Sequence, residues 1–191
     1  LNFDWGKPVD LELVKKQLNN KKYKIVAIVH AETSTGVRNP VEQIRQLLDG
    51  ECIFIVDAVT SLGTINLEVD RWGIDAVYSC SQKGLSCPPG ASPVSFSDRA
   101  QEKILNRKSV VPNFYLDMQQ LMQYLGGNQR VYHHTAPINS MYAIYQGLYD
   151  LQKEGIDNTI MRHQEVHKAF VLGIKELGLD MFVDSNYRLP S

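Results

Sequence analysis

One lysine stands in a short turn that directly follows an apolar strand pattern. Lys83 lies within residues 79–90, a stretch rich in serine, glycine and proline, which predicts a rigid turn. Upstream, the apolar residues 52–56 predict a buried parallel strand that ends at Asp57, and α/β sheets gather their ligands at the carboxyl ends of such strands. A lysine amine can bond the aldehyde of pyridoxal 5′-phosphate (PLP), and a carboxylate can keep its pyridine nitrogen protonated. The pair therefore predicts a PLP site.

Each of these two residues has an ordinary explanation when it is taken alone. An aspartate at a strand end is common as a helix cap or turn former, and a lysine in a loop is usually a solvated charge. Asp57 and Lys83, however, both follow strand patterns, and a turn rich in glycine and proline fixes the backbone after the lysine. The combination favours a catalytic site over two unrelated structural residues.

The surrounding elements predict an α/β fold in which helices flank a mostly parallel sheet. Apolar runs predict strands at residues 25–29, 52–56, 75–78, 91–96 and 181–183, and Pro93 makes the fourth of these an edge strand or an irregular strand. Helical periodicity predicts helices at residues 9–18, 40–48, 99–107, 140–153 and 158–177, with a short helix inside a loop-like passage at 110–128. The strand and helix order places Asp57 and Lys83 at one edge of the sheet.

Composition excludes several functional classes. The chain has 191 residues of which 43% are hydrophobic, enough for the core of about one domain. A net charge of -1 without a basic cluster argues against binding to nucleic acid or to an anionic membrane. No apolar run approaches the roughly 20 residues of a membrane helix. Three cysteines make no disulfide framework, so we expect a soluble protein in a reducing, intracellular compartment.

No metal site is expected. His163 and His167 share a predicted helix face, but Gln164 stands where a zinc protease helix carries its glutamate. Cys80 and Cys87 are too far apart for a CxxC pair. We expect the two histidines to lie on a solvated helix face.

Several motifs resemble one family of PLP enzymes. They are Asp-Ala-Val-Thr-Ser-Leu-Gly at 57–63, Ser-Gln-Lys at 81–83 followed by Pro-Pro-Gly at 88–90, and Tyr-His-His-Thr at 132–135. Over nearly its whole length the sequence is similar to the alanine-glyoxylate / serine-pyruvate aminotransferases, which are class V members of the fold type I PLP-dependent enzymes. The resemblance implies transamination from alanine or serine to glyoxylate or pyruvate, with amino acids and 2-oxo acids as small-molecule partners.

The resemblance also implies roles for the residues near the lysine. Lys83 would hold the cofactor and move a proton at the substrate's α-carbon, and Asp57 would pair with the pyridine nitrogen. Val59 would pack against the ring face. Gln82 would donate to the phosphate.

Hydroxyl groups elsewhere match further cofactor ligands of the family. Thr33 would hydrogen-bond the phenolic oxygen, although Ser34 and Thr35 are equally good donors. Tyr132 and Thr135 match phosphate ligands that reach into the neighbouring subunit's site. This match implies a homodimer with shared active sites.

The family's enzymes are about twice as long, so the resemblance implies that this chain is a piece of a longer protein. Residues 1–155 would be part of the PLP-binding large domain, and residues 156–191 a long linking helix and the start of the small C-terminal domain. The family's Ser-Gly phosphate loop and ring-stacking aromatic residue would precede Leu1, and its substrate-carboxylate arginine would follow Ser191. Family members also imply a peroxisomal or mitochondrial location, with the cytoplasm left open.

Three other functions stay open. A kynurenine-pathway transaminase has very similar motifs. A cysteine desulfurase-like enzyme uses a cysteine on a mobile loop, whereas Cys80 and Cys87 lie in the lysine turn. In the form given, the chain could also be a noncatalytic fragment that binds PLP weakly.

Overall fold

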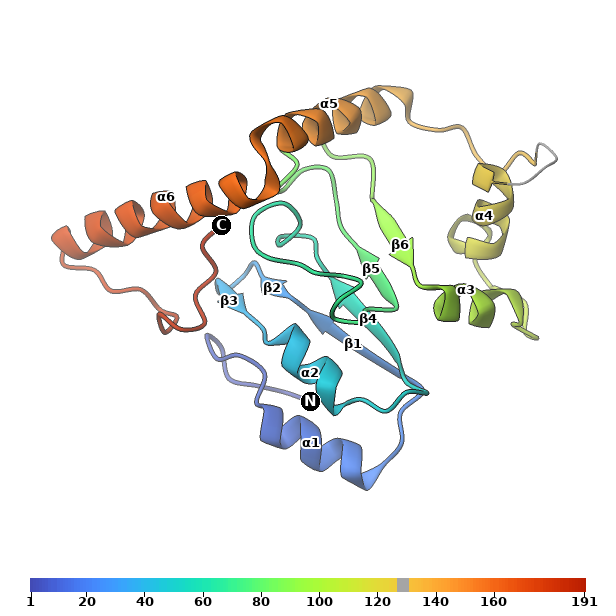
Figure 1. The fold of residues 1–191 in the computed structure, drawn as a ribbon, viewed down its shortest axis with the longest axis horizontal. Helices are drawn as coiled ribbons and strands as arrows, with labels where there is room; N and C mark the ends of the chain where they lie inside the picture. The colour runs from blue at the N-terminus through green and yellow to red at the C-terminus, as the bar shows by residue number, and fades with distance from the viewer. Residues whose placement is uncertain (127–130) are drawn as a thin grey trace.

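The computed structural model describes residues 1–126 and 131–191, and its centre is a four-stranded sheet in the order β1-β4-β5-β6. Strands β1 (Ile25–Val29), β4 (Ile53–Asp57) and β5 (Ala76–Tyr78) run parallel, and β6 (Val94–Phe96) is an antiparallel edge strand. This arrangement confirms the expected α/β fold with a mostly parallel sheet (Figure 1). The register pairs Asp57 with Val29 on one side and Tyr78 on the other, so the aspartate lies at the carboxyl edge of the sheet.

Two helices cover one face of this sheet, namely α1 (Leu11–Asn20) and α2 (Val41–Leu47) (Figure 1). Phe54 and Val56 point to this side and are fully buried, in one core cluster with Val41 and Ile44 of α2. Burial of an apolar side chain of this size contributes about 1.5 to 3 kcal/mol. The packing explains the continuous apolar run of β4 and holds the strand that ends at Asp57.

The remaining elements follow the ends of strands β1 and β6. A small hairpin pairs β2 (Ala31–Glu32) with β3 (Val37–Arg38). Next come α3 (Asp98–Leu105), the 3-10 helix η1 (Phe114–Leu116) and α4 (Met118–Gly126). The long helices α5 (Ile138–Glu154) and α6 (Ile156–Glu176) form the arm at the top of Figure 1. Residues 127 and 128 of the expected loop passage lie outside the described residues.

The strand expected at residues 181–183 is wrong. Val183 is buried, but its carbonyl accepts hydrogen bonds from the Arg188 guanidinium at 3.1 Å and 2.8 Å instead of from a neighbouring strand. This tail meets the hairpin through a single antiparallel bridge between Arg188 and Val37. Three apolar residues form a strand only where a neighbouring strand can pair with them. Among the described residues, no strand pairs with residues 181–183.

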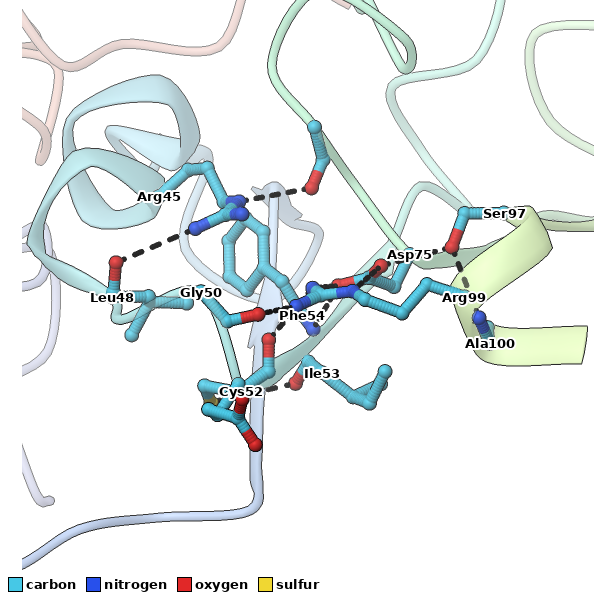
Figure 2. A network of polar contacts seen from close by, with 12 residues as sticks. Arg45, Leu48, Gly50, Cys52, Ile53, Phe54, Asp75, Ser97, Arg99 and Ala100 are labelled. Carbon is cyan, nitrogen blue, oxygen red and sulfur yellow. Dashed lines mark hydrogen bonds and ion pairs between the residues drawn. The ribbon is translucent and has the colours of Figure 1, made fainter. Parts of the chain in front are cut away.

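One ion pair joins the sheet to the helix that follows it. Arg99, in the first turn of α3, forms a salt bridge with Asp75 and also donates to the Cys52 carbonyl at 2.8 Å (Figure 2). Asp75 further accepts from the Phe54 N–H at 2.8 Å and from the Ser97 hydroxyl at 2.9 Å. Burial opposes ionisation of Asp75, but these hydrogen bonds outweigh it and lower its pKa below the ordinary value. The network fixes β4, β5 and α3 relative to one another.

Candidate active site

Asp57 is held by hydrogen bonds to both of its carboxylate oxygens. Oδ1 accepts from the Val59 backbone N–H at 2.8 Å, and Oδ2 accepts from the Tyr78 hydroxyl at 2.8 Å. The Tyr78 pKa is raised by burial, then by the hydrogen bond to Asp57 and by the charge of Asp57. The phenol therefore stays a neutral donor at physiological pH. With two donors from two strand ends, the carboxylate has one defined orientation.

Lys83 stands on a turn that closes on itself. The Ser81 hydroxyl is buried and donates to the Pro88 carbonyl at 2.7 Å, and the Cys87 N–H donates to the Ser81 carbonyl at 3.0 Å. Inside this loop the Ser86 N–H donates to the Lys83 carbonyl at 2.8 Å. The Lys83 side chain is exposed, and its amine makes no hydrogen bond or ion pair with any residue that the structure describes. The turn thus fixes the backbone and leaves the amine available.

The turn is packed directly against the loop that follows Asp57. A Cβ on Gly84 would overlap the Leu62 carbonyl, so only glycine fits there. Gly63 has a φ of +80°, and a Cβ on it would lie 3.6 Å from the Gly84 carbonyl oxygen. The Ser79 hydroxyl adds a hydrogen bond to the Ala58 carbonyl at 2.9 Å. These contacts bring the segment that carries Lys83 and the segment that begins at Asp57 together in one rigid unit.

Helix α5 covers the outer side of the turn. Gly147 lets the helix approach, because a Cβ there would lie 2.5 Å from the Leu85 carbonyl oxygen and 2.6 Å from the Cys87 sulfur. The Cys87 thiol donates toward the carbonyls of Leu85 and Ala143 at 3.0 Å and 3.1 Å. Cys80 is buried, with its sulfur 3.8 Å from the Val59 carbonyl. Both thiols are therefore engaged in packing the turn.

The turn of the β2–β3 hairpin supplies a hydroxyl to the same edge. Thr33 and Thr60 share a hydrogen bond of 2.5 Å between their hydroxyl oxygens, which ties the hairpin to the loop after Asp57. The Ser34 hydroxyl instead donates to the Glu32 carboxylate at 2.7 Å, and the Thr35 hydroxyl is buried. Of the three hydroxyl residues considered at this turn, Thr33 is the one that reaches the Asp57 loop.

Tyr132 and Thr135 lie apart from this edge. Their hydroxyls are 2.7 Å from each other, and the Tyr132 ring meets that of Tyr124 in α4 with 6.4 Å between centroids. Both residues are exposed, in the segment that leads from α4 to the start of α5 (Figure 1). Among the described residues, no hydrogen bond or aromatic contact joins either of them to the Lys83 turn. Their expected role at a cofactor phosphate stays a prediction.

Two further residues of the site, Tyr78 and Thr60, were missed in the sequence. Tyr78 ends β5 and lies directly opposite Asp57 in the register, so a signal was present: both residues close neighbouring parallel strands. Thr60 had no signal beyond its hydroxyl, because its partner Thr33 comes from a distant turn.

The available groups fit PLP chemically. Asp57 can accept a hydrogen bond from a protonated ring nitrogen, and the Lys83 amine can bond an aldehyde. The hydroxyl groups of Thr33 and Thr60 can donate a hydrogen bond to a phenolic oxygen. Gln82 is exposed beside Lys83 and can donate a hydrogen bond through its amide.

The described residues, 1–126 and 131–191, contain no group of three or more His, Cys, Asp or Glu that could hold a metal ion. Within the same residues, no helix combines the length and the apolar character needed to cross a membrane.

Comparison with known proteins relates this geometry to one family. The family model for class-V aminotransferases matches residues 1–188. The alanine–glyoxylate aminotransferase of Oryctolagus cuniculus is 39% identical over 192 residues, which cover 98% of this chain and 49% of the relative. Among solved structures, the alanine–glyoxylate aminotransferase of Nostoc sp. has a TM-score of 0.92 at 44% identity and matches 100% of this chain and 51% of that one. The ureidoglycine–glyoxylate aminotransferase of Bacillus subtilis has a TM-score of 0.95 at 36% identity, over 100% and 49% of the two chains.

The chain thus spans about half the length of the curated relatives it matches. The match nevertheless runs through all the elements that hold Asp57 and Lys83. The chain belongs to the class-V aminotransferase family.

Proposed function

We propose that this chain provides the lysine and the aspartate of a PLP-dependent aminotransferase that moves an amino group from alanine or serine to glyoxylate or pyruvate. The observation that carries the proposal is the rigid unit in which a doubly hydrogen-bonded Asp57 and an available Lys83 amine share the carboxyl edge of a parallel sheet. The three relatives described above all have glyoxylate in their names, whereas the named donor differs. We therefore propose glyoxylate as the main acceptor.

Each residue of this edge has a distinct task in the proposed reaction. PLP, when bound, supplies an electron sink that makes the hydrogen on the substrate's α-carbon acidic. The Lys83 amine holds the cofactor and then takes and returns that proton at its Nζ atom. Asp57 holds a proton on the ring nitrogen. Val59 packs against the ring face, and Thr33 donates to the phenolic oxygen.

The phosphate is the group for which this edge offers the fewest ligands. Gln82 is the side chain beside Lys83 that can donate to it, and residues 57–63 and 79–90 contain no arginine, and no lysine other than Lys83, to balance its charge. Tyr132 and Thr135 are exposed and away from the Lys83 turn, which suits residues that bind the phosphate of a neighbouring subunit. We therefore propose a homodimer in which each site draws on both chains.

Mixed dimers test this arrangement in the full-length protein. A Lys83→Ala subunit paired with a Thr135→Ala subunit should contain one site with both defects and one intact site, so about half of the wild-type activity per dimer should survive. A site built wholly within one chain would leave no intact site in the mixed dimer. Tyr132→Phe and Thr135→Ala alone should each weaken PLP retention by roughly 1.5 to 3 kcal/mol, the value of a charge-assisted hydrogen bond.

The reaction itself is tested by kinetics of the full-length protein with PLP. Alanine and glyoxylate should give pyruvate and glycine. Serine, kynurenine and cysteine are then tested as amino donors in place of alanine. Turnover of kynurenine would point to a kynurenine-pathway transaminase, and release of sulfide from cysteine would point to a cysteine desulfurase-like enzyme. Asp57→Asn should cut the transamination rate by orders of magnitude, because an amide cannot favour a protonated ring nitrogen. Asp70→Asn, an exposed aspartate away from the site, is the matched control. Normal turnover by the Asp57 variant would contradict the proposal.

A further inference from the structure

The hydroxyl of Tyr78 is the only side-chain group among the described residues that hydrogen-bonds the Asp57 carboxylate. Its oxygen lies 2.8 Å from Oδ2, the carboxylate oxygen that the Val59 N–H leaves unoccupied. The two residues are paired in the parallel ladder, so the contact is set by the register of β4 and β5 and not by a flexible loop. The geometry is therefore built into the sheet.

The Tyr78 hydroxyl does not need Asp57 as its hydrogen-bond acceptor. Its side chain is 43% exposed, and a phenol of that exposure can donate to water instead. The bond is of consequence mainly for the carboxylate, because a donor to an ionised carboxylate stabilises the charged form. The raised pKa of Tyr78, caused by burial and then by Asp57, keeps the phenol protonated and able to donate.

We propose that Tyr78 is a positioning residue that holds the Asp57 carboxylate in the orientation that meets the cofactor's ring nitrogen, an inference that rests on the proposed function. The proton shared by Asp57 and the ring nitrogen can be bound either to a carboxylate oxygen or to the nitrogen. The hydrogen bond from Tyr78 stabilises the state in which the carboxylate is charged and the proton is on the nitrogen. Without the phenol, Oδ2 of Asp57 loses its side-chain donor, and the state with the proton on the ring nitrogen becomes less favoured.

The test uses the full-length protein loaded with PLP that carries ¹⁵N in its ring. The ¹⁵N chemical shift of the ring reports whether the nitrogen is protonated, independently of turnover. Tyr78→Phe keeps the ring and removes only the hydroxyl. Tyr23→Phe is the matched control, since Tyr23 also loses a hydrogen-bonded hydroxyl, 2.5 Å from the Gln17 amide, at the far end of β1. Asp57→Asn serves as the reference for a site without the carboxylate.

Tyr78→Phe should move the ¹⁵N resonance from the protonated toward the unprotonated position and lower kcat about tenfold, equivalent to about 1.4 kcal/mol, with a smaller change in KM. Tyr23→Phe should change neither. A large effect of Asp57→Asn together with an unchanged resonance and rate in Tyr78→Phe would overturn the role of Tyr78 and leave the proposed function standing. An Asp57→Asn protein with a normal resonance and rate would overturn the proposed function, and the role of Tyr78 with it.

Discussion

Acid should destabilise this fold through one buried histidine. His30 follows β1 and is 3% exposed, with its ring edge-on to Trp72 at 5.7 Å between centroids. Its Nδ1 atom is buried without a hydrogen-bond partner in the described part of the chain. Burial, and then the charge of Arg38, lower the His30 pKa from 6.5 to about 4. The folded protein therefore keeps His30 neutral at a pH where an unfolded chain protonates it.

The size and sign of the effect follow from this difference. Between pH 6.5 and about 4 the unfolded state binds the extra proton, so the free energy of unfolding falls as the pH is lowered through this window. A difference of about 2.5 pH units, at 1.36 kcal/mol each, sets an upper value of about 3 kcal/mol. Above pH 6.5 both states are neutral at His30, and the contribution of this residue is constant.

Urea unfolding at a series of pH values measures this effect. His30→Phe is the matched variant, because it keeps a ring against Trp72 but has no titrating group. The free energy of unfolding of the wild type should fall more steeply between about pH 6.5 and pH 4 than that of the variant, by up to about 3 kcal/mol in total. Parallel curves for the two proteins would refute the reasoning, since all other titrating groups are shared.

Two further substitutions test how the site is held. Gly84→Ala should destabilise the protein by about 1 to 3 kcal/mol and weaken PLP binding, because the new Cβ collides with backbone of the Asp57 loop, whereas Gly50→Ala, with open space around it, should do neither. Thermal unfolding and PLP titration measure both. Arg99→Ala leaves Asp75 buried without its cation and should cost about 3 kcal/mol in a urea titration, whereas the exposed ion-pair variant Arg71→Ala should cost less than about 1 kcal/mol. Equal costs for the two arginine variants would contradict the structural role assigned to Arg99.

Local signals predicted most of the fold. The apolar run at 25–29 predicted β1 to the residue, and β4 and β5 differ from their predicted bounds by one residue. The strand predicted at 91–96 is shorter in the structure: β6 (Val94–Phe96) is an edge strand of the described sheet and begins just after Pro93, which has no N–H to donate to a neighbouring strand. These predictions succeeded because burial on a parallel sheet and chain breakers act within a few residues.

Features that depend on distant partners were not predicted. The bridge between Val37 and Arg188 replaces the strand expected at 181–183, and the hairpin formed by β2 and β3 was read only as a turn. Within the site, Asp57 and Lys83 carried recognisable patterns. Tyr78 could have been found from the ends of two neighbouring strand patterns, whereas Thr60 depends on the docking of the hairpin and could not be predicted from its neighbours in the sequence.

The central claim is that the Lys83 amine carries the cofactor, and one chemical mapping experiment tests it most directly. Borohydride reduction of the PLP-loaded full-length protein fixes the cofactor on whichever lysine bonds it, and peptide mapping then identifies that lysine. The account predicts a pyridoxyl group on the peptide that contains Lys83. A pyridoxyl group on another lysine, such as Lys103 or Lys108, with none on Lys83 would contradict it.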